Sequence, residues 1–508
     1  MNITAKRKKI VDQEGHAFPS RTYQEIVLEP AFDQAKQNFI EPMIQIHFAH
    51  VIMLVEEGII SREEGMEIAR AIKKINIDEI KSSEYNPDFE DLFFKVERLL
   101  IDKAGDVAGN LHIARSRNDM GIAIYRLTLR KKILGLIEAA LHLRECLIAL
   151  TEEHIDTIML GYTHTQQAQP TTLGHYFNAV TDILTRDIQR FMSAFQTVNR
   201  SSMGAAALTT SGFSINRDRM KQLLGFDDII ENAWDAVSGA DYIGETASTV
   251  HLAAINMGRS LQDWLVWGTQ EFGAFKLSSP YVQISSIMPQ KQNPVSIEHM
   301  RALLSSVCGD AQTVLMMMHN TPFGDIVDTE DDMQPYIWKA IDQLKNIYNL
   351  LSSVLVTMEV NRSLLLERAR KSFANVTELA DTLVRSDKLP FRKSHEIVSA
   401  TVQELTEEGL DSLEYLTLER LNKHAERIIG RKLTIDEKEL KNALSPEHFI
   451  NIRKVLGGPS PETMKEAITN RKKQQKQLEN WLGEKTEQIE KGKRMIEEVL
   501  KEWNIEKS

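Results

Sequence analysis

Proline is absent from two long stretches of this chain. No proline falls between Pro87 and Pro170 or between Pro170 and Pro280, and a proline inside a helix removes a hydrogen bond and clashes with the preceding turn. In the first stretch apolar residues recur at alternating spacings of four and three, which places them on one helix face: Leu129, Ile133, Leu136, Ala140, Leu143, Leu147 and Leu150. A second apolar row repeats every seven residues on another side: Leu127, Leu134, Leu141 and Ile148. A helix that is apolar on several sides is buried, so the sequence predicts a long helix inside a bundle.

Apolar rows of the same kind recur in four further segments, whereas strand signals are almost absent. These segments are Thr172–Val198, Thr246–Phe272, Ser296–Met318 and Pro335–Met358. The pattern predicts an all-α protein with a central bundle of long helices. We expect three domains: an N-terminal helical domain over residues 1–112, the bundle over 113–364, and a C-terminal helical domain over 365–508 that ends in a charged helix.

Composition limits the class of protein. The 508 residues carry a net charge of −11, spread over the chain, and this charge argues against a protein that binds nucleic acid through a basic face. Cys146 and Cys308 are the only cysteines; they are too few for a disulfide framework and are not in metal-ligand spacing, so a reducing compartment is expected. No signal peptide is visible, and no apolar run approaches the roughly 20 residues that span a bilayer. We therefore expect a soluble cytoplasmic protein without nucleic-acid or membrane partners.

Three segments rich in reactive polar side chains flank the predicted long helices. Residues 112–119 read H-I-A-R-S-R-N-D, and their two arginines can grip a carboxylate through paired hydrogen bonds. Residues 161–170 read G-Y-T-H-T-Q-Q-A-Q-P, with one histidine suited to acid–base chemistry. Residues 285–294 read S-S-I-M-P-Q-K-Q-N-P, where a nearby ammonium group can lower the proton affinity of a serine. Taken singly, each segment also fits a structural role: a capped helix start, a hydrogen-bonding histidine, or an ordinary loop.

Taken together, in this order and with these separations, the three segments resemble the fumarase/aspartase superfamily, whose signature loop reads G-S-S-x-M-P-x-K-x-N-P. Within that superfamily the chain is most similar to argininosuccinate lyases, through R-S-R-N-D at 115–119, G-Y-T-H-x-Q-x-A-Q-P at 161–170 and M-P-Q-K-x-N-P at 288–294. The likeness continues through A-D-T-L-V-R at 380–385 and G-G-P at 457–459, and it covers most of residues 40–470.

This resemblance implies an assembly, a reaction and a set of site residues. The assembly is a homotetramer with a core of long helices from four subunits, in which each active site is shared by three subunits. The reaction is an anti elimination that releases fumarate and an amine from an N-substituted aspartate, without metal or organic cofactor. The implied catalytic residues are Ser285 as the base, His164 paired with Glu298, and Lys291. The implied substrate-binding residues are Ser116, Arg117, Asn118, Thr163, Gln169 and Asn293, of which Asn293, with Lys291, would stabilise the dianion formed by proton removal.

The chain departs from the argininosuccinate lyase pattern at two places in the site. Ile284 stands where the signature loop has glycine, which restricts the backbone of that loop. The family's Y-N-K-D-x-Q-E-D-K segment, which holds the arginine part of the substrate, reads D-I-V-D-T-E-D-D-M at residues 325–333, so Asp325 and Glu330 replace tyrosine and glutamine. These acidic residues fit either a solvated loop or a pocket wall.

Three functional interpretations follow. The chain is a divergent argininosuccinate lyase of arginine biosynthesis, a paralogue that cleaves another aminosuccinate, such as one derived from a diamine or another amino acid, or an inactive helical scaffold. The altered amine half of the site favours the second interpretation. The intact Ser285, Lys291 and His164 argue against the third.

Overall fold

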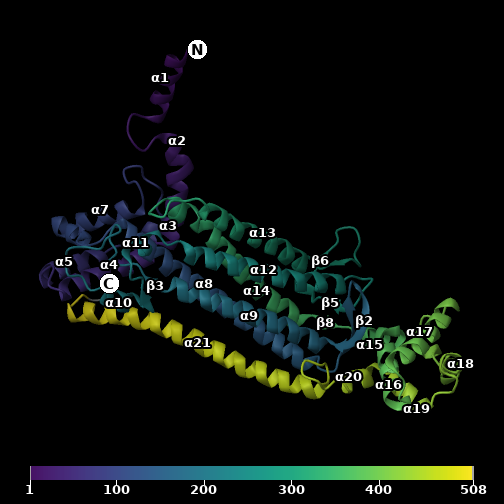
Figure 1. Ribbon diagram of the computed structural model, residues 1–508. Coiled ribbons are helices and arrows are strands. Elements are labelled where there is room, and N and C mark those ends of the chain that lie inside the picture. Colours follow the sequence, from purple (N-terminus) through teal and green to yellow (C-terminus); the bar gives the residue numbers. More distant parts are fainter. Residues whose placement is uncertain (1, 506–508) are drawn as a thin grey trace.

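Five long helices form the body of the protein, seen in a computed structural model that describes residues 2–505 (Figure 1). They lie side by side along one axis, and the all-α prediction is confirmed. Each of the five predicted long helices is present. They are α8 (Arg117–Glu153), α9 (Leu173–Val198), α12 (Asp241–Trp267), α13 (Val295–Met318) and α14 (Gln334–Thr357).

Helix α8 is the buried centre of this bundle. It begins at a capping box, in which the Ser116 backbone N–H donates to Asp119 (3.0 Å) and the Ser116 hydroxyl accepts from the first turn. Both apolar rows read from the sequence are buried except for Leu134, which is partly buried, and Leu129, Leu136, Leu143 and Leu147 are fully buried. Its 37 residues give a length of about 55 Å at 1.5 Å per residue. The helix therefore separates the segments that precede and follow it by most of the length of the molecule.

Shorter helices gather at the end of the bundle where α8 begins (Figure 1). Helix α4 is buried there along most of its length, whereas α1 and α2 project from the body without a buried residue. The elements of this region are α1 (Ile3–Glu14), α2 (Arg21–Tyr23), a π-helical turn (Gln24–Leu28), α3 (Glu29–Asn38), α4 (Ile40–Glu56), α5 (Arg62–Lys73), α6 (Ile77–Ser82), α7 (Leu92–Ala104) and a 3-10 helix (Gly105–His112). Further along the chain, α10 (Arg217–Leu224) and α11 (Ala233–Ser238) also lie near this end.

Two hairpins lie at the opposite end of the bundle (Figure 1). β1 (Ile158–Thr163) and β2 (Gln166–Thr172) form an antiparallel pair with an irregularity between Leu160 and Tyr162. β6 (Gln283–Ile284) and β7 (Gln292–Asn293) form a shorter one. The remaining strands form two-residue pairs: β3 (Arg200–Ser201) with β4 (Asp228–Ile229), and β5 (Phe275–Lys276) with β8 (Glu359–Val360).

The C-terminal region divides into a small helical cluster and one long helix. The small cluster has its own apolar core, which includes Leu379, Leu383 and Ile397. Its elements are α15 (Arg362–Lys371), α16 (Val376–Asp387), α17 (Phe391–Glu407), α18 (Leu418–Ile429), α19 (Glu437–Ala443) and α20 (Pro446–Asn451). Helix α21 (Pro461–Glu502) instead runs back along the bundle, where its apolar residues join the main core. The domain boundaries near residues 112 and 364 stay a prediction.

No single helix within residues 2–505 is long and apolar enough to cross a membrane. Two consecutive segments, Arg21–Asn38 and Ile40–Glu56, pass that test only as a pair, and they are bent by 65° relative to each other.

Candidate active site

The first part of the candidate site is the start of α8, where Ser116, Arg117 and Asn118 lie together. The Ser116 hydroxyl donates to Asn118 Oδ1 (2.7 Å) and accepts from the Asn118 backbone N–H (3.2 Å). Arg117 forms an ion pair with Asp91, and its guanidinium lies over the Phe93 and Phe94 rings, 5.4 and 4.8 Å from their centres. Sequence reasoning missed Asp91, although its place as the N-cap of α7, just before two phenylalanines, marks it as a fixed carboxylate. The predicted carboxylate-binding residues are thus pre-positioned by the cap of α8 and the start of α7.

Residues 325–332, the acidic segment, pack against this start of α8. Asn118 Nδ2 donates to Asp325 Oδ2 over 2.6 Å, and the Tyr125 hydroxyl donates to Asp331 over 2.9 Å. Residues Asp328–Asp332 form a π-helical turn. Burial, followed by the hydrogen bond with Asp325 and its negative charge, raises the pKa of Glu330 to about 9. Asp325 is exposed, whereas Glu330 is partly buried and hydrogen-bonded to it, so this segment lies beside the predicted substrate-binding residue Asn118. Whether it forms a pocket wall stays a prediction.

The second part of the candidate site is the serine hairpin, residues 283–293, at the opposite end of α8. The pairing of Gln283 with Asn293 and of Ile284 with Gln292 brings Ser285 close to Lys291, and the Ser285 N–H donates to the Lys291 carbonyl (3.4 Å). The Ser285 hydroxyl accepts from the backbone N–H of Met288 (3.1 Å) and of Ile287 (3.4 Å). Two amides pointed at this oxygen stabilise it when it loses its proton. Ile284, which replaces the family's glycine, is 72% exposed.

The third part is the histidine hairpin, residues 158–172, which the sequence had predicted as a loop before a helix. His164 and Thr165 form its tip with φ of +51° and +62°, a left-handed conformation that residues other than glycine rarely adopt. Thr163, His164 and Gln169 are all exposed, and Gln169 Nε2 donates to Thr377 Oγ1 of the small C-terminal cluster (3.4 Å).

Glu298, the expected partner of His164, lies exposed in the first turn of α13. No hydrogen bond or ion pair joins these two side chains within the described chain. The expected pair is therefore not formed inside one subunit.

The predicted site residues therefore fall into two groups at opposite ends of the bundle (Figure 1). Ser116, Arg117 and Asn118 lie at the start of α8, whereas the histidine hairpin follows the end of α8 and the serine hairpin precedes α13. A helix of about 55 Å stands between the groups, and an aminosuccinate is far too small to contact both. One chain alone does not assemble the constellation.

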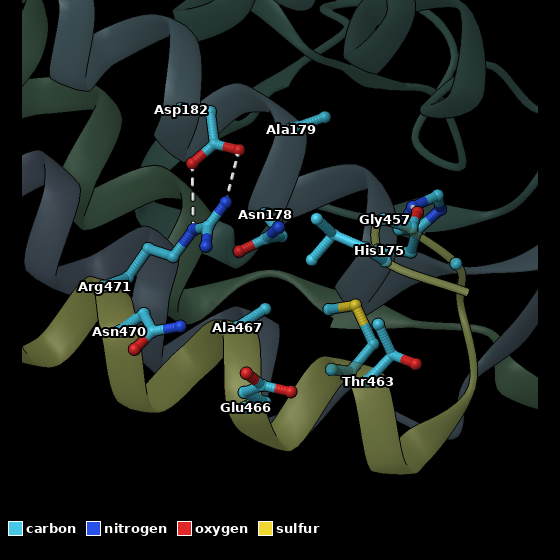
Figure 2. A pocket seen from close by; sticks show the side chains of 13 residues that line it. His175, Asn178, Ala179, Asp182, Gly457, Thr463, Glu466, Ala467, Asn470 and Arg471 are labelled. Carbon is cyan, nitrogen blue, oxygen red and sulfur yellow. Dashed lines mark hydrogen bonds and ion pairs between the residues drawn. The ribbon is translucent and has the colours of Figure 1, made fainter. Parts of the chain in front are cut away.

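A cavity elsewhere in the fold contains none of the predicted site residues. It has a volume of about 180 Å³ and lies between α9, α21 and the loop at Gly457 (Figure 2). Arg471 and Asp182 pair through two hydrogen bonds (2.9 and 2.6 Å) on one side of it, and His175 Nε2 lies 2.9 Å from the Gly457 carbonyl oxygen. These contacts fasten α21 and the Gly457 loop to α9. Among residues 2–505, no group of three or more His, Cys, Asp or Glu is placed to hold a metal ion.

Comparison with known proteins shows similarity over nearly the whole chain. Residues 45–309 match the family model described as Lyase, and residues 373–451 match the model described as Argininosuccinate lyase C-terminal. Argininosuccinate lyase 2 of Agrobacterium fabrum is 41% identical over 89% of this chain and 90% of its own length. The argininosuccinate lyase of Methanocaldococcus jannaschii is 35% identical over 92% of this chain and 94% of its own. Among solved structures, an EDDS lyase variant with bound fumarate superposes with a TM-score of 0.85, at 28% identity over 95% of this chain and 96% of that one.

Proposed function

Because this chain belongs to the argininosuccinate lyase family, and is a carbon–nitrogen lyase that releases fumarate, we propose that it cleaves argininosuccinate at sites shared between copies of the chain. The observation that carries the shared site is the separation of the predicted residues by the length of α8. A second copy lying antiparallel would bring the start of its own α8 to the serine and histidine hairpins of the first.

Exposed apolar side chains on the bundle support an assembly of several copies. They lie on α12, α13 and α14, the helices that form one side of the bundle, and include Ile255 (44% exposed), Met316 (64%) and Val356 (54%). Covering such side chains removes apolar surface from water and stabilises association. We propose a homotetramer in which each site takes the Ser116–Asn118 segment, the histidine hairpin and the serine hairpin from three different subunits.

The proposed chemistry begins with proton removal by Ser285. Its hydroxyl accepts from the Met288 and Ile287 amides, which would stabilise the alkoxide. The proton comes from the carbon next to a substrate carboxylate, and Lys291 and Asn293 would stabilise the resulting dianion. The electron pair then forms the double bond of fumarate as the C–N bond breaks and the amine leaves with a proton.

The remaining predicted residues bind and orient the substrate. Ser116, Arg117 and Asn118 would hold the second carboxylate of the succinyl part, and Thr163 and Gln169 would donate hydrogen bonds from the histidine hairpin. His164 would pair with Glu298 of another subunit and lie near the substrate carboxylates.

The amine half of the substrate would meet the acidic segment. Asp325 contacts Asn118 and lies beside Glu330, whose raised pKa keeps it protonated at neutral pH in the free protein. Asp325 would pair with the planar, cationic guanidinium of argininosuccinate, and that positive charge would lower the pKa of Glu330 and favour its ionised form. A different aminosuccinate, which the sequence alone favoured, is not favoured by the curated relatives, since both of those named above match most of this chain and are argininosuccinate lyases. An inactive scaffold is not favoured either. A cytoplasmic location stays a prediction.

The proposal is tested by supplying the purified protein with argininosuccinate and with other aminosuccinates, and following fumarate by its absorbance. We expect argininosuccinate to be the best substrate, and Ser285→Ala to lower turnover at least ~10³-fold while circular dichroism and particle size stay unchanged. Ser286→Ala, one residue away and exposed, is the matched control and should retain activity. A Ser285→Ala variant that keeps more than about a tenth of wild-type turnover contradicts the role of the base. Faster cleavage of another aminosuccinate contradicts the substrate.

A further inference from the structure

Two buried histidines of α4 contact the loop that leads into α8. His47 and His50, each 2% exposed, lie three residues apart and therefore on one face of the helix. His50 Nε2 lies 3.0 Å from the Ile113 carbonyl oxygen, and His47 Nδ1 lies 2.9 Å from Arg115 Nη1. The two contacts are on either side of Ala114, which has φ of +57°.

The partners fix the hydrogen-bonding role of each ring. A carbonyl oxygen only accepts, so His50 donates from Nε2. A guanidinium only donates, so His47 accepts at Nδ1 and carries no proton there. Burial lowers the pKa of His50 to about 3 and that of His47 well below 6.5, and the Arg115 charge lowers both further, so both rings are neutral at neutral pH.

The backbone between these contacts is strained. Alanine in the left-handed region brings its Cβ close to the backbone, and such a residue persists only where its surroundings hold it. Arg115 is 92% buried, since 8% of its surface is exposed, and among the described residues its Nε and Nη2 atoms have no hydrogen-bond partner. The hydrogen bonds that Arg115 donates to His47 and that His50 donates to Ile113 thus hold a turn whose backbone conformation is otherwise unfavourable.

We propose that His47 and His50 are positioning residues, which clamp residues 113–115 so that Ser116, Arg117 and Asn118 face the substrate carboxylate. Only the second part of this proposal, that these three side chains face the substrate carboxylate, rests on the proposed function. Ser116 follows Arg115 directly, so a change of the backbone at Ala114 displaces the cap of α8 and the side chains that it orients.

Isosteric substitutions test the clamp, because asparagine places its amide near the Nδ1 position of histidine and glutamine places its amide near Nε2. His47→Asn keeps the acceptor, and His50→Gln keeps the donor. The exchanged pair, His47→Gln and His50→Asn, puts each amide at the wrong position. All four variants replace a buried ring by a smaller amide. The two variants at each position therefore differ mainly in where the amide lies, and each serves as the matched control for the other.

Hydrogen–deuterium exchange of residues 111–120 is measured in the full-length protein, together with KM for argininosuccinate and melting temperature. We expect exchange close to wild type in His47→Asn and His50→Gln, and faster exchange in His47→Gln and His50→Asn. KM should rise about tenfold or more in the exchanged pair only, since small displacements of binding groups are costly, while all four melting temperatures shift alike.

If hydrogen–deuterium exchange is equally fast in all four variants, the clamp is overturned, whatever the enzyme's substrate. If hydrogen–deuterium exchange is faster only in His47→Gln and His50→Asn but KM is the same in all four variants, the positioning role is overturned. If the wild-type protein leaves argininosuccinate unchanged, the proposed function fails, and the exchange measurement still decides whether the clamp exists.

Discussion

Burial sets the charge of several single residues near the start of α8. It is the largest cause that lowers the pKa of His50 to about 3 and that of His112 to about 4. It also raises the pKa of Asp119 to about 6, although three backbone amides and the Arg115 charge oppose the shift. The lowered pKa values of the histidines and the raised pKa of Asp119 make the free energy of unfolding change with pH in opposite directions.

The histidine contribution to stability should disappear in acid. An unfolded histidine titrates near 6.5, so between about pH 6.5 and pH 3 the unfolded chain binds a proton at His50 that the folded chain does not. The free energy of unfolding therefore falls as pH is lowered through this window. Asp119 acts with the opposite sign: between about pH 4 and 6 the folded chain keeps a proton at Asp119 that the unfolded chain has lost, so the free energy of unfolding rises as pH is lowered through this window.

The difference between wild type and His50→Gln isolates the histidine. Urea unfolding at one protein concentration should show that wild type loses its advantage over the variant as pH falls from 7 to about 4. Parallel pH profiles for the two proteins would show that His50 does not titrate differently in the folded state.

At the scale of elements, the long helices were predictable and the histidine hairpin was not. Proline-free stretches and apolar rows locate α8, α9, α12, α13 and α14 to within a few residues. The turn of the histidine hairpin lacks the glycine or asparagine that usually marks a two-residue turn, and His164 and Thr165 adopt positive φ without that signal. Exposed and buried residues also do not alternate regularly along β2, so the period of two that marks a strand is weak there.

Close approach of α9 to the end of α8 depends on a residue without a side chain. A Cβ at Gly174 would lie 2.6 Å from the Thr151 carbonyl oxygen and 2.8 Å from that of His154. Gly174→Ala should therefore destabilise the fold by about 1–3 kcal/mol, as in other overpacked sites. Gly483→Ala on α21 is the control: a Cβ there meets nothing within 4 Å, so this change should stabilise by about 0.5–1 kcal/mol.

Thermal or urea unfolding of the two alanine variants measures both effects under identical conditions. Equal stability of the two variants would show that the backbone of α8 and α9 moves apart at little cost.

At the scale of the whole molecule, the sequence allowed the site segments and their order along the chain to be predicted, but not their positions in space. The motifs identify Ser116–Asn118, His164 and the serine hairpin by residue type and spacing. Whether the acidic segment contacts Asn118, 207 residues away along the chain, depends on how α8, α13 and α14 pack together. Likewise, only the fold shows that α8 holds Ser116–Asn118 far from the histidine and serine hairpins within one chain.

The central claim, that each site takes segments from different subunits, is tested most directly by mixing inactive variants. Arg117→Ala and Ser285→Ala tetramers are dissociated mildly, mixed in equal amounts and reassociated, and fumarate release is measured. If the two segments come from different chains chosen at random, about a quarter of the sites carry neither lesion, and about a quarter of wild-type activity returns. Ser285→Ala mixed with Lys291→Ala is the control, because every serine hairpin then carries one lesion and no activity should return. An inactive first mixture, or equal recovery in both mixtures, would contradict shared sites.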